Sequence, residues 1–126
     1  SVSPIVDESQ VKTRLDQEEQ LRGRKFTPGQ RASLETIFSS ESRYIGVDGL
    51  AGTGKTTMLH TLNKVASENG FIVKGMAATG VAAKNLELET GIPSKTMAMF
   101  QIKENELQKE IEKNGGVNRK NEIWIV

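Results

Sequence analysis

The chain has 126 residues, 17 of them basic and 16 acidic, so its formal net charge is only +1. This length allows one domain at most, and the near-neutral charge lacks the basic excess that often marks a duplex-DNA-binding module. The absence of cysteine excludes disulfides and cysteine-based metal sites, and the lone histidine, His60, excludes a histidine-rich site.

Residues 1–25 differ in composition from the rest of the chain. They carry mixed charges and few large apolar side chains, and they lack the apolar core of a signal peptide. Because no later run approaches the roughly 18 apolar residues of a membrane span, we expect a cytoplasmic location and no membrane partner. Val11 and Leu15 are spaced i, i+4, so a charged helical arm and a flexible linker are both consistent with this segment. We expect residues 26–126 to form the globular part.

A helix is predicted to begin after Thr27. Thr27 is a good N-cap, Pro28 suits the first helical position, and Gln30 completes a capping box. Apolar residues then follow at helical spacing to about residue 39, namely Ala32, Leu34, Ile37 and Phe38.

The remainder of the chain alternates strands with helices. Three β-rich runs, at 44–48, 71–77 and 122–126, predict strands. Helices are predicted from the glycine loop to about residue 68, over 79–90, over 94–101 with Ser94 as the cap, and in the charged segment 103–113. This alternation predicts an α/β fold with a parallel sheet flanked by helices.

A glycine-rich loop lies between the first predicted strand and the next helix. Residues 49–56 read G-L-A-G-T-G-K-T and fit the phosphate-binding pattern G-x-x-x-x-G-K-[ST]. The glycines let backbone N–H groups turn inward around phosphate oxygens, and the following helix adds the positive end of its dipole. The pattern assigns nucleotide contacts to Gly49, Ala51, Gly52, Thr53, Gly54, Lys55, Thr56 and Thr57.

Lys55 and Thr56 carry the chemistry of this loop. Lys55 would reach the β- and γ-phosphates of a nucleotide and the Thr56 hydroxyl would ligate Mg²⁺, so ATP and Mg²⁺ are the expected cofactors. The alternative, a glycine-rich turn without a ligand, is disfavoured by the strand and helix on either side. We interpret Asp48 as a strand end rather than a catalytic acid, His60 as an exposed helix position, and Trp124 as a packing residue.

Three further segments accompany the loop: F-T-P-G-Q at 26–30, A-A-T-G-V-A-A-K at 77–84 and G-I-P-S-K-T-M-A-M-F at 91–100. Taken in this order, the four segments resemble the RecD-like branch of superfamily 1 DNA helicases, above all the helicase region of TraI-like conjugative relaxase–helicases. The resemblance covers residues 26–126. It implies a P-loop NTPase fold of the RecA-like type, of which this chain would be the N-terminal portion.

The resemblance also implies residue roles. Gln30 would contact the adenine base, with its capping-box role as the other reading. Thr79 and Gly80 match a motif that holds a phosphate of single-stranded DNA at a helix start, and Thr96 matches a threonine near the same strand. Helix capping and a polar first-turn position are the respective alternatives. Val81 stands where the family often has arginine, and this lowers the DNA affinity that we expect.

The final run, 123–126, resembles the strand that leads into the family's Asp–Glu pair, which holds Mg²⁺ and positions the attacking water. That pair would follow Val126, so we expect residues 1–126 to bind nucleotide without useful hydrolysis.

The leading interpretation is a fragment of an ATP-dependent DNA helicase or translocase from a conjugative relaxase. Its expected partners are single-stranded DNA, the rest of the parent helicase and the conjugation machinery. The alternative is a non-enzymatic RecD-like module for single-strand binding or for docking to secretion machinery. A small-molecule P-loop kinase fits less well, because it needs an arginine-rich lid that this sequence lacks.

Overall fold

The computed structural model describes residues 3–47, 54–114 and 121–126. Its elements in chain order are η1 (Glu8–Gln10), α1 (Val11–Arg22), α2 (Pro28–Ser39), β1 (Tyr44–Ile45), α3 (Lys55–Glu68), β2 (Ile72–Ala77), α4 (Gly80–Thr90), β3 (Ser94–Thr96), α5 (Met97–Asn114) and β4 (Glu122–Ile125). Within the described residues, four strands form one sheet in the order β1-β4-β2-β3, and each neighbouring pair is parallel. The predicted α/β fold is therefore confirmed.

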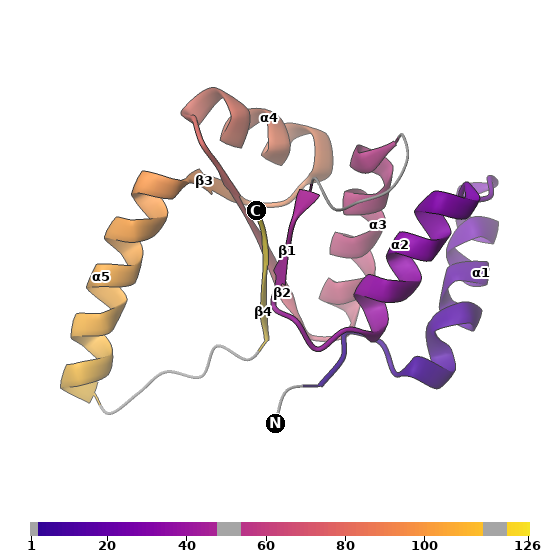
Figure 1. Ribbon diagram of the computed structural model, residues 1–126, viewed down its shortest axis with the longest axis horizontal. Coiled ribbons are helices and arrows are strands. Elements are labelled where there is room, and N and C mark those ends of the chain that lie inside the picture. The colour runs from indigo at the N-terminus through magenta and orange to yellow at the C-terminus, as the bar shows by residue number, and fades with distance from the viewer. Residues whose placement is uncertain (1–2, 48–53, 115–120) are drawn as a thin grey trace.

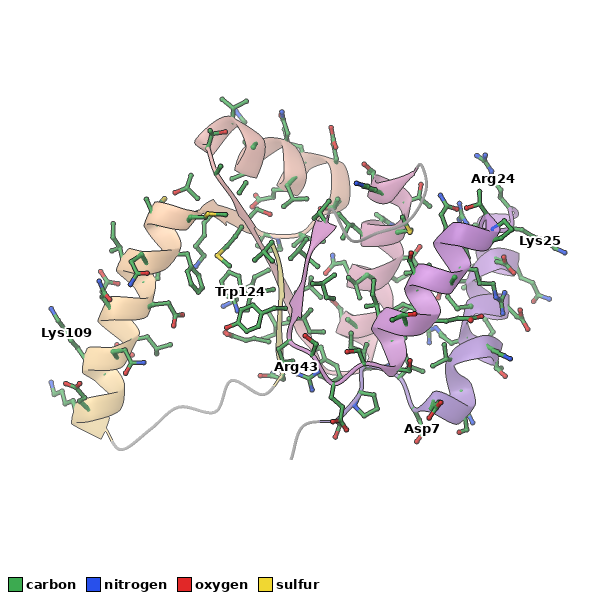
Figure 2. All side chains as sticks on the ribbon, viewed as in Figure 1. Asp7, Arg24, Lys25, Arg43, Lys109 and Trp124 are labelled. Carbon is green, nitrogen blue, oxygen red and sulfur yellow. The ribbon has the colours of Figure 1, made fainter. Side chains whose placement is uncertain are left out.

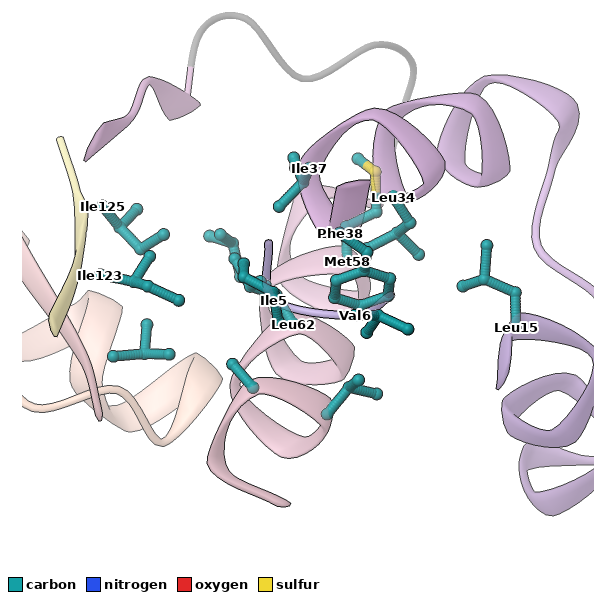
Figure 3. Packing of buried hydrophobic residues seen from close by; sticks show 14 of the residues in the cluster. Ile5, Val6, Leu15, Leu34, Ile37, Phe38, Met58, Leu62, Ile123 and Ile125 are labelled. Atoms are coloured by element: carbon teal, nitrogen blue, oxygen red, sulfur yellow. The ribbon is translucent and has the colours of Figure 1, made fainter. Parts of the chain in front are cut away.

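The helices lie on both sides of this sheet. Figure 1 shows α1, α2 and α3 gathered on one side, with α5 standing apart on the other. The main core lies between the sheet and α2 and α3, where Ile123 of β4 meets Phe38 of α2 and Leu62 of α3 in one buried cluster (Figure 3). Full burial of a side chain of this size contributes about 1.5–3 kcal/mol, so the cluster accounts for much of the stability of the sheet–helix interface.

The N-terminal segment belongs to the same core. Ile5, Val11 and Leu15 are buried members of the cluster, and the Val6 backbone N–H donates to the Phe38 carbonyl over 2.9 Å. The helical alternative for this segment is thus the one that the structure adopts. The division into an arm and a globular part at residue 25 stays a prediction, and in the structure α1 packs against α2 and forms ion pairs with α3.

Residues 94–96 form a strand, so the prediction of a helix starting at Ser94 is wrong. Ser94 pairs with Gly75 of β2, and the Gly75 N–H donates to the Pro93 carbonyl over 2.8 Å. A Cβ added at Gly75 would collide with the Ser94 hydroxyl and with Leu86. The glycine in β2 therefore lets β3 approach, and pairing with that neighbour overrides the local helical pattern.

The next helix accordingly begins later and runs longer than predicted. The Thr96 side chain, rather than that of Ser94, accepts the first-turn N–H of Met99 over 3.1 Å. From there α5 runs without a break through both segments that the sequence analysis treated as separate helices. Ala32 also differs from expectation, since it is exposed on α2 while Leu34 is buried.

The second face of the sheet carries Trp124. Its ring meets Phe100 of α5 edge to face, with the ring centroids 4.7 Å apart, and Figure 2 shows it on the side of the sheet toward α5. Trp124 is buried, which confirms its interpretation as a packing residue, and His60 is exposed on α3 as predicted. In the described ranges, no helix has the length and apolarity needed to cross a membrane.

Candidate nucleotide-binding site

The described part of the predicted phosphate site is the start of α3. Residues Asp48, Gly49, Ala51, Gly52 and Thr53 lie outside the described residues, so the structure reports on Gly54, Lys55, Thr56 and Thr57. The loop follows the carboxyl end of β1, where the Val47 N–H donates to the Val126 carbonyl over 2.9 Å. The end of β4 therefore lies directly beside the strand that leads into the loop.

The first turn of α3 is uncapped among the described residues. Its N-cap position is Gly54, with φ 78° and ψ 35°, and this residue makes no side-chain cap. By contrast, α2 and α4 begin with the threonine caps Thr27 and Thr79. The first N–H groups of a helix need acceptors and carry the positive end of its dipole. This helix start is therefore suited to an anion.

Lys55, Thr56 and Thr57 occupy that first turn. Thr56 is exposed, whereas Lys55 and Thr57 are half-buried. In the part of the chain that the structure describes, no group of three or more His, Cys, Asp or Glu side chains could hold a metal ion. Mg²⁺ keeps several waters and commonly takes phosphate oxygens as ligands, so a single hydroxyl from Thr56 fits an ion that arrives with a nucleotide.

Gln30 lies against the start of α3. Its Oε1 accepts the Thr27 N–H over 2.9 Å, and Thr27 Oγ1 accepts the Gln30 N–H over 3.1 Å, so the predicted capping box is present. Gln30 is only 7% exposed, and a Cβ added at Gly54 would collide with its Nε2. The structure thus brings together two predicted nucleotide contacts, Gln30 and Gly54, that lie in separate segments of the sequence. The adenine contact itself stays a prediction.

An open cleft of about 400 Å³ lies beside Thr56 and Thr57. Its other wall comes from α1, through Leu21 and Arg22. The Arg22 guanidinium carbon stands 4.2 Å from the centroid of the Phe26 ring, at the start of the segment that leads into α2. The sequence of α1 indicates no functional residue, because the helix has mixed charges and a weak apolar pattern.

A buried carboxylate fastens α1 to α3. Glu18 is 3% exposed, and it pairs with Lys64 of α3 over 2.8 Å and with Arg14 over 3.1 Å. Buried charges require such partners, since desolvating a carboxylate costs several kcal/mol. Arg14 also pairs with Glu68, and this bond lowers the pKa of the Glu68 carboxyl. The signal for this contact in the sequence was Glu18 itself, three residues after Leu15 on the apolar face of α1.

The predicted DNA contacts lie at the same edge of the sheet as the glycine loop. Ala77 at the end of β2 pairs with Thr96 at the end of β3, so the starts of α4 and α5 are neighbours. Thr79 Oγ1 accepts the Ala82 N–H over 3.1 Å, and Thr96 caps α5. Both threonines therefore act as helix caps, and their DNA contacts stay predictions. No heavy atom in the described ranges lies within 4 Å of a Cβ placed at Gly80, so packing does not explain that glycine.

Lys95, which is next to Thr96, is partly buried among side chains of both charges. Burial lowers the pKa of Lys95, and the nearby charges of Lys74 and Lys103 lower it further. Glu104 and Glu122 act in the opposite direction. The group is therefore mixed in charge and is weaker evidence for an anion site than the start of α3.

Comparison with known proteins identifies the family. A family model described as an AAA domain matches residues 25–126, and the chain belongs to that family. The chain is 34% identical over 91 residues, 72% of its length, to the probable conjugal transfer protein TraA of Sinorhizobium fredii. It is 35% identical over 82 residues, 65% of its length, to the conjugal transfer protein TraA of Rhizobium radiobacter. These matches cover 8% and 7% of the two relatives, so the chain corresponds to a small part of each.

The matches confirm the resemblance to RecD-like proteins of conjugation. Together with the parallel sheet and the position of the glycine loop between β1 and α3, they establish an α/β fold of the P-loop type.

Proposed function

We propose that this chain is the nucleotide-binding part of an ATP-dependent DNA helicase or translocase in a conjugative relaxase. The observation that carries the proposal is the start of α3, where Gly54 leaves the first turn without a described side-chain cap and Lys55 and Thr56 follow at once. The AAA family and the conjugal transfer relatives support it. A cytoplasmic location, where ATP is available, belongs to the same proposal.

The described residues of the proposed site have different roles in binding the nucleotide. The N–H groups at the start of α3 donate hydrogen bonds to the phosphate oxygens, and Lys55 balances the charge of the β- and γ-phosphates. The Thr56 hydroxyl holds Mg²⁺, which neutralises charge on the same phosphates. Gln30, already placed against Gly54, presents its amide to the adenine base.

Single-stranded DNA is the proposed partner at the starts of α4 and α5. A phosphate would approach Gly80, where the space for a side chain is open, and would meet the positive end of α4. Thr79 and Thr96 lie at the ends of β2 and β3 and fix the two helix starts. Because the start of α4 is already capped by Thr79, this contact is weaker than the one at α3.

The proposal is tested by titrating Mg·ATP into the 126-residue chain and into Lys55→Ala. We expect the substitution to weaken binding more than about tenfold, since it removes a charge that is paired with phosphate, while thermal stability stays unchanged. Lys84→Ala, an exposed lysine on α4, is the matched control and should bind as the unmodified chain does. Equal affinities for the unmodified chain and Lys55→Ala would refute the proposal.

A second candidate is a RecD-like module for single-strand binding or for docking to secretion machinery. It is favoured by the apolar stripe on the outer face of α4, where Val81 and Leu88 are 73% and 72% exposed. Under this alternative, binding of single-stranded DNA or of a conjugation protein would be unaffected by Lys55→Ala. The need for an acidic pair beyond Val126 to support hydrolysis stays a prediction.

A further inference from the structure

We propose that Glu19 of α1 is a positioning residue for recognition of the nucleotide base, acting through Gln30. The inference rests on the proposed nucleotide function and extends the site into the N-terminal helix. Glu19 touches no predicted nucleotide contact directly. It holds the chain on both sides of the capping box in which Gln30 lies.

One carboxylate makes both contacts. Glu19 Oε2 accepts the backbone N–H of Phe26 over 2.8 Å, and Glu19 Oε1 pairs with Arg31 Nη1 over 2.9 Å. Phe26 immediately precedes Thr27, and Arg31 immediately follows Gln30. The side chain of Glu19 is 13% exposed, so these bonds are largely shielded from water. Charge-assisted hydrogen bonds of this kind are about twice as strong as neutral ones.

The backbone of α1 fixes where this carboxylate points. Gly23 ends the helix with φ 69°, its N–H donates to the Gln20 carbonyl, and the Arg24 N–H donates to the carbonyl of Glu19 itself. This is a Schellman turn, which holds the last turn of α1 in place. The Glu19 side chain is therefore presented from a fixed helix end toward the start of α2.

The consequence reaches the nucleotide site through a short series of contacts. Glu19 fixes Phe26 and Arg31, the capping box fixes Gln30 between them, and Gln30 lies against Gly54. A carboxylate beside the first turn of α2 also suits the positive end of that helix. Loss of Glu19 frees the start of α2, and the Gln30 amide then loses its fixed orientation.

Arg31 offers a matched control, because three carboxylates surround it. It pairs with Glu35 over 3.3 Å and with Asp16 over 2.8 Å, as well as with Glu19. Glu35→Gln removes one carboxylate from the same arginine, but it leaves the Phe26 N–H bonded to Glu19. A merely electrostatic effect on Arg31 would appear in both variants, whereas a positioning effect appears in Glu19→Ala.

The test compares ATP and GTP, since Gln30 is proposed to read the base and the phosphates are common to both. The 126-residue chain is titrated with each nucleotide, as are Glu19→Ala, Glu35→Gln and Gln30→Ala. We expect Glu19→Ala to weaken ATP binding about fivefold and GTP binding less than about twofold, with Glu35→Gln unchanged for both. The double variant Glu19→Ala with Gln30→Ala should have a ratio of ATP to GTP affinity no lower than that of Gln30→Ala alone, because Glu19 acts through Gln30.

The outcomes separate this inference from the function on which it rests. Equal loss of ATP and GTP affinity in Glu19→Ala, or preserved discrimination, would overturn the role of Glu19 and leave nucleotide binding standing. Additive effects of Glu19 and Gln30 would overturn it as well. Failure of the unmodified chain to bind either nucleotide, with Lys55→Ala no different, would overturn both proposals. If Glu19→Ala unfolds, Glu19→Gln keeps the acceptor for Phe26 and should retain most of the discrimination; loss of discrimination in a folded Glu19→Gln would count against the role.

Discussion

α3 and α4 both follow a parallel strand, yet they begin in opposite ways. Thr79 closes the start of α4 by accepting the Ala82 N–H, whereas α3 starts at left-handed Gly54 with no cap from the described side chains. A threonine cap is worth about 1 kcal/mol, so α3 begins without a stabilising bond that α4 has. The difference agrees with our proposal that the start of α3 holds a ligand, whereas the start of α4 is capped by its own threonine.

The largest effect is expected when the start of α3 is closed by a side chain. Gly54→Ala forces a side chain into a left-handed conformation and into Gln30, which costs about 1–2 kcal/mol for the backbone alone, before the collision is counted. We expect loss of Mg·ATP binding by more than about tenfold together with a lower midpoint of thermal unfolding.

Gly91→Ala is the control for Gly54→Ala. Gly91 has a similar φ of 76°, but the nearest atom to its added Cβ is Asn63 Nδ2 at 3.8 Å. This variant should lose a similar backbone contribution and keep its nucleotide affinity. Equal loss of binding in both variants would show that general destabilisation, and not the site, is responsible.

A smaller effect is expected from loss of the Thr56 hydroxyl. Thr56 is exposed on the first turn of α3, so Thr56→Ala should leave stability unchanged. We expect it to remove most of the gain in ATP affinity that Mg²⁺ provides, about fivefold, because the ion loses its one protein ligand in our proposal. Titrations with and without Mg²⁺ measure this gain, and an undiminished gain in Thr56→Ala would exclude the proposed ligand. Thr61→Ala changes a buried threonine five residues further along α3 and serves to show that loss of a hydroxyl elsewhere on the helix has no such effect.

Removal of the threonine caps of α2 and α4 should lower stability equally but affect the binding of different ligands. Thr27→Ala and Thr79→Ala each remove a cap, and each should lower the free energy of unfolding by about 1 kcal/mol. Thr27→Ala should also weaken ATP binding through Gln30, while Thr79→Ala should weaken binding of a single-stranded oligonucleotide. Thr79→Asp keeps a capping oxygen and adds negative charge, so it should restore stability without restoring DNA binding. Restoration of both would show that Thr79 acts only as a cap.

The smallest effect concerns Asp7, which caps the short helix η1. Hydrogen bonds from the Ser9 side chain and backbone hold the pKa of Asp7 below its ordinary 3.8. The resulting stability is present above that value and is lost as the pH falls through the lowered pKa of the folded state. Asp7→Asn should therefore flatten the decline of the unfolding midpoint as the pH falls below the ordinary pKa of 3.8. An unchanged slope would exclude a contribution from Asp7; the Glu68 carboxyl, whose pKa is also lowered, would be the next to test.

Local patterns predicted the parts of this structure that depend on neighbouring residues in the chain. The caps at Thr27 and Thr79 and the position of Lys55 on the first turn of a helix follow from sequence spacing, and the structure has all three. Ser94 was placed wrongly, because its strand depends on Gly75 in β2 rather than on the residues beside it. Pairing between distant segments leaves no trace in a local pattern.

The same limit applied to the site. The loop pattern identified Gly54 as a nucleotide contact and the family resemblance identified Gln30, but their mutual contact is visible only in the fold. The contribution of α1 was missed for a related reason. Glu18 and Glu19 read as solvated charges on a weakly apolar helix, and only their partners on α2 and α3 show that they are structural.

The strand order has a consequence for how this molecule reaches its native state. β4 is the last of the four described strands in the chain, yet it lies between β1 and β2 and bonds to both. β1 and β2 therefore do not pair with each other. The register of β1 is set only when Tyr44 pairs with Trp124 of β4. Contacts so distant in sequence slow folding. During synthesis β1 and β2 can therefore be joined in one sheet only after β4 has left the ribosome.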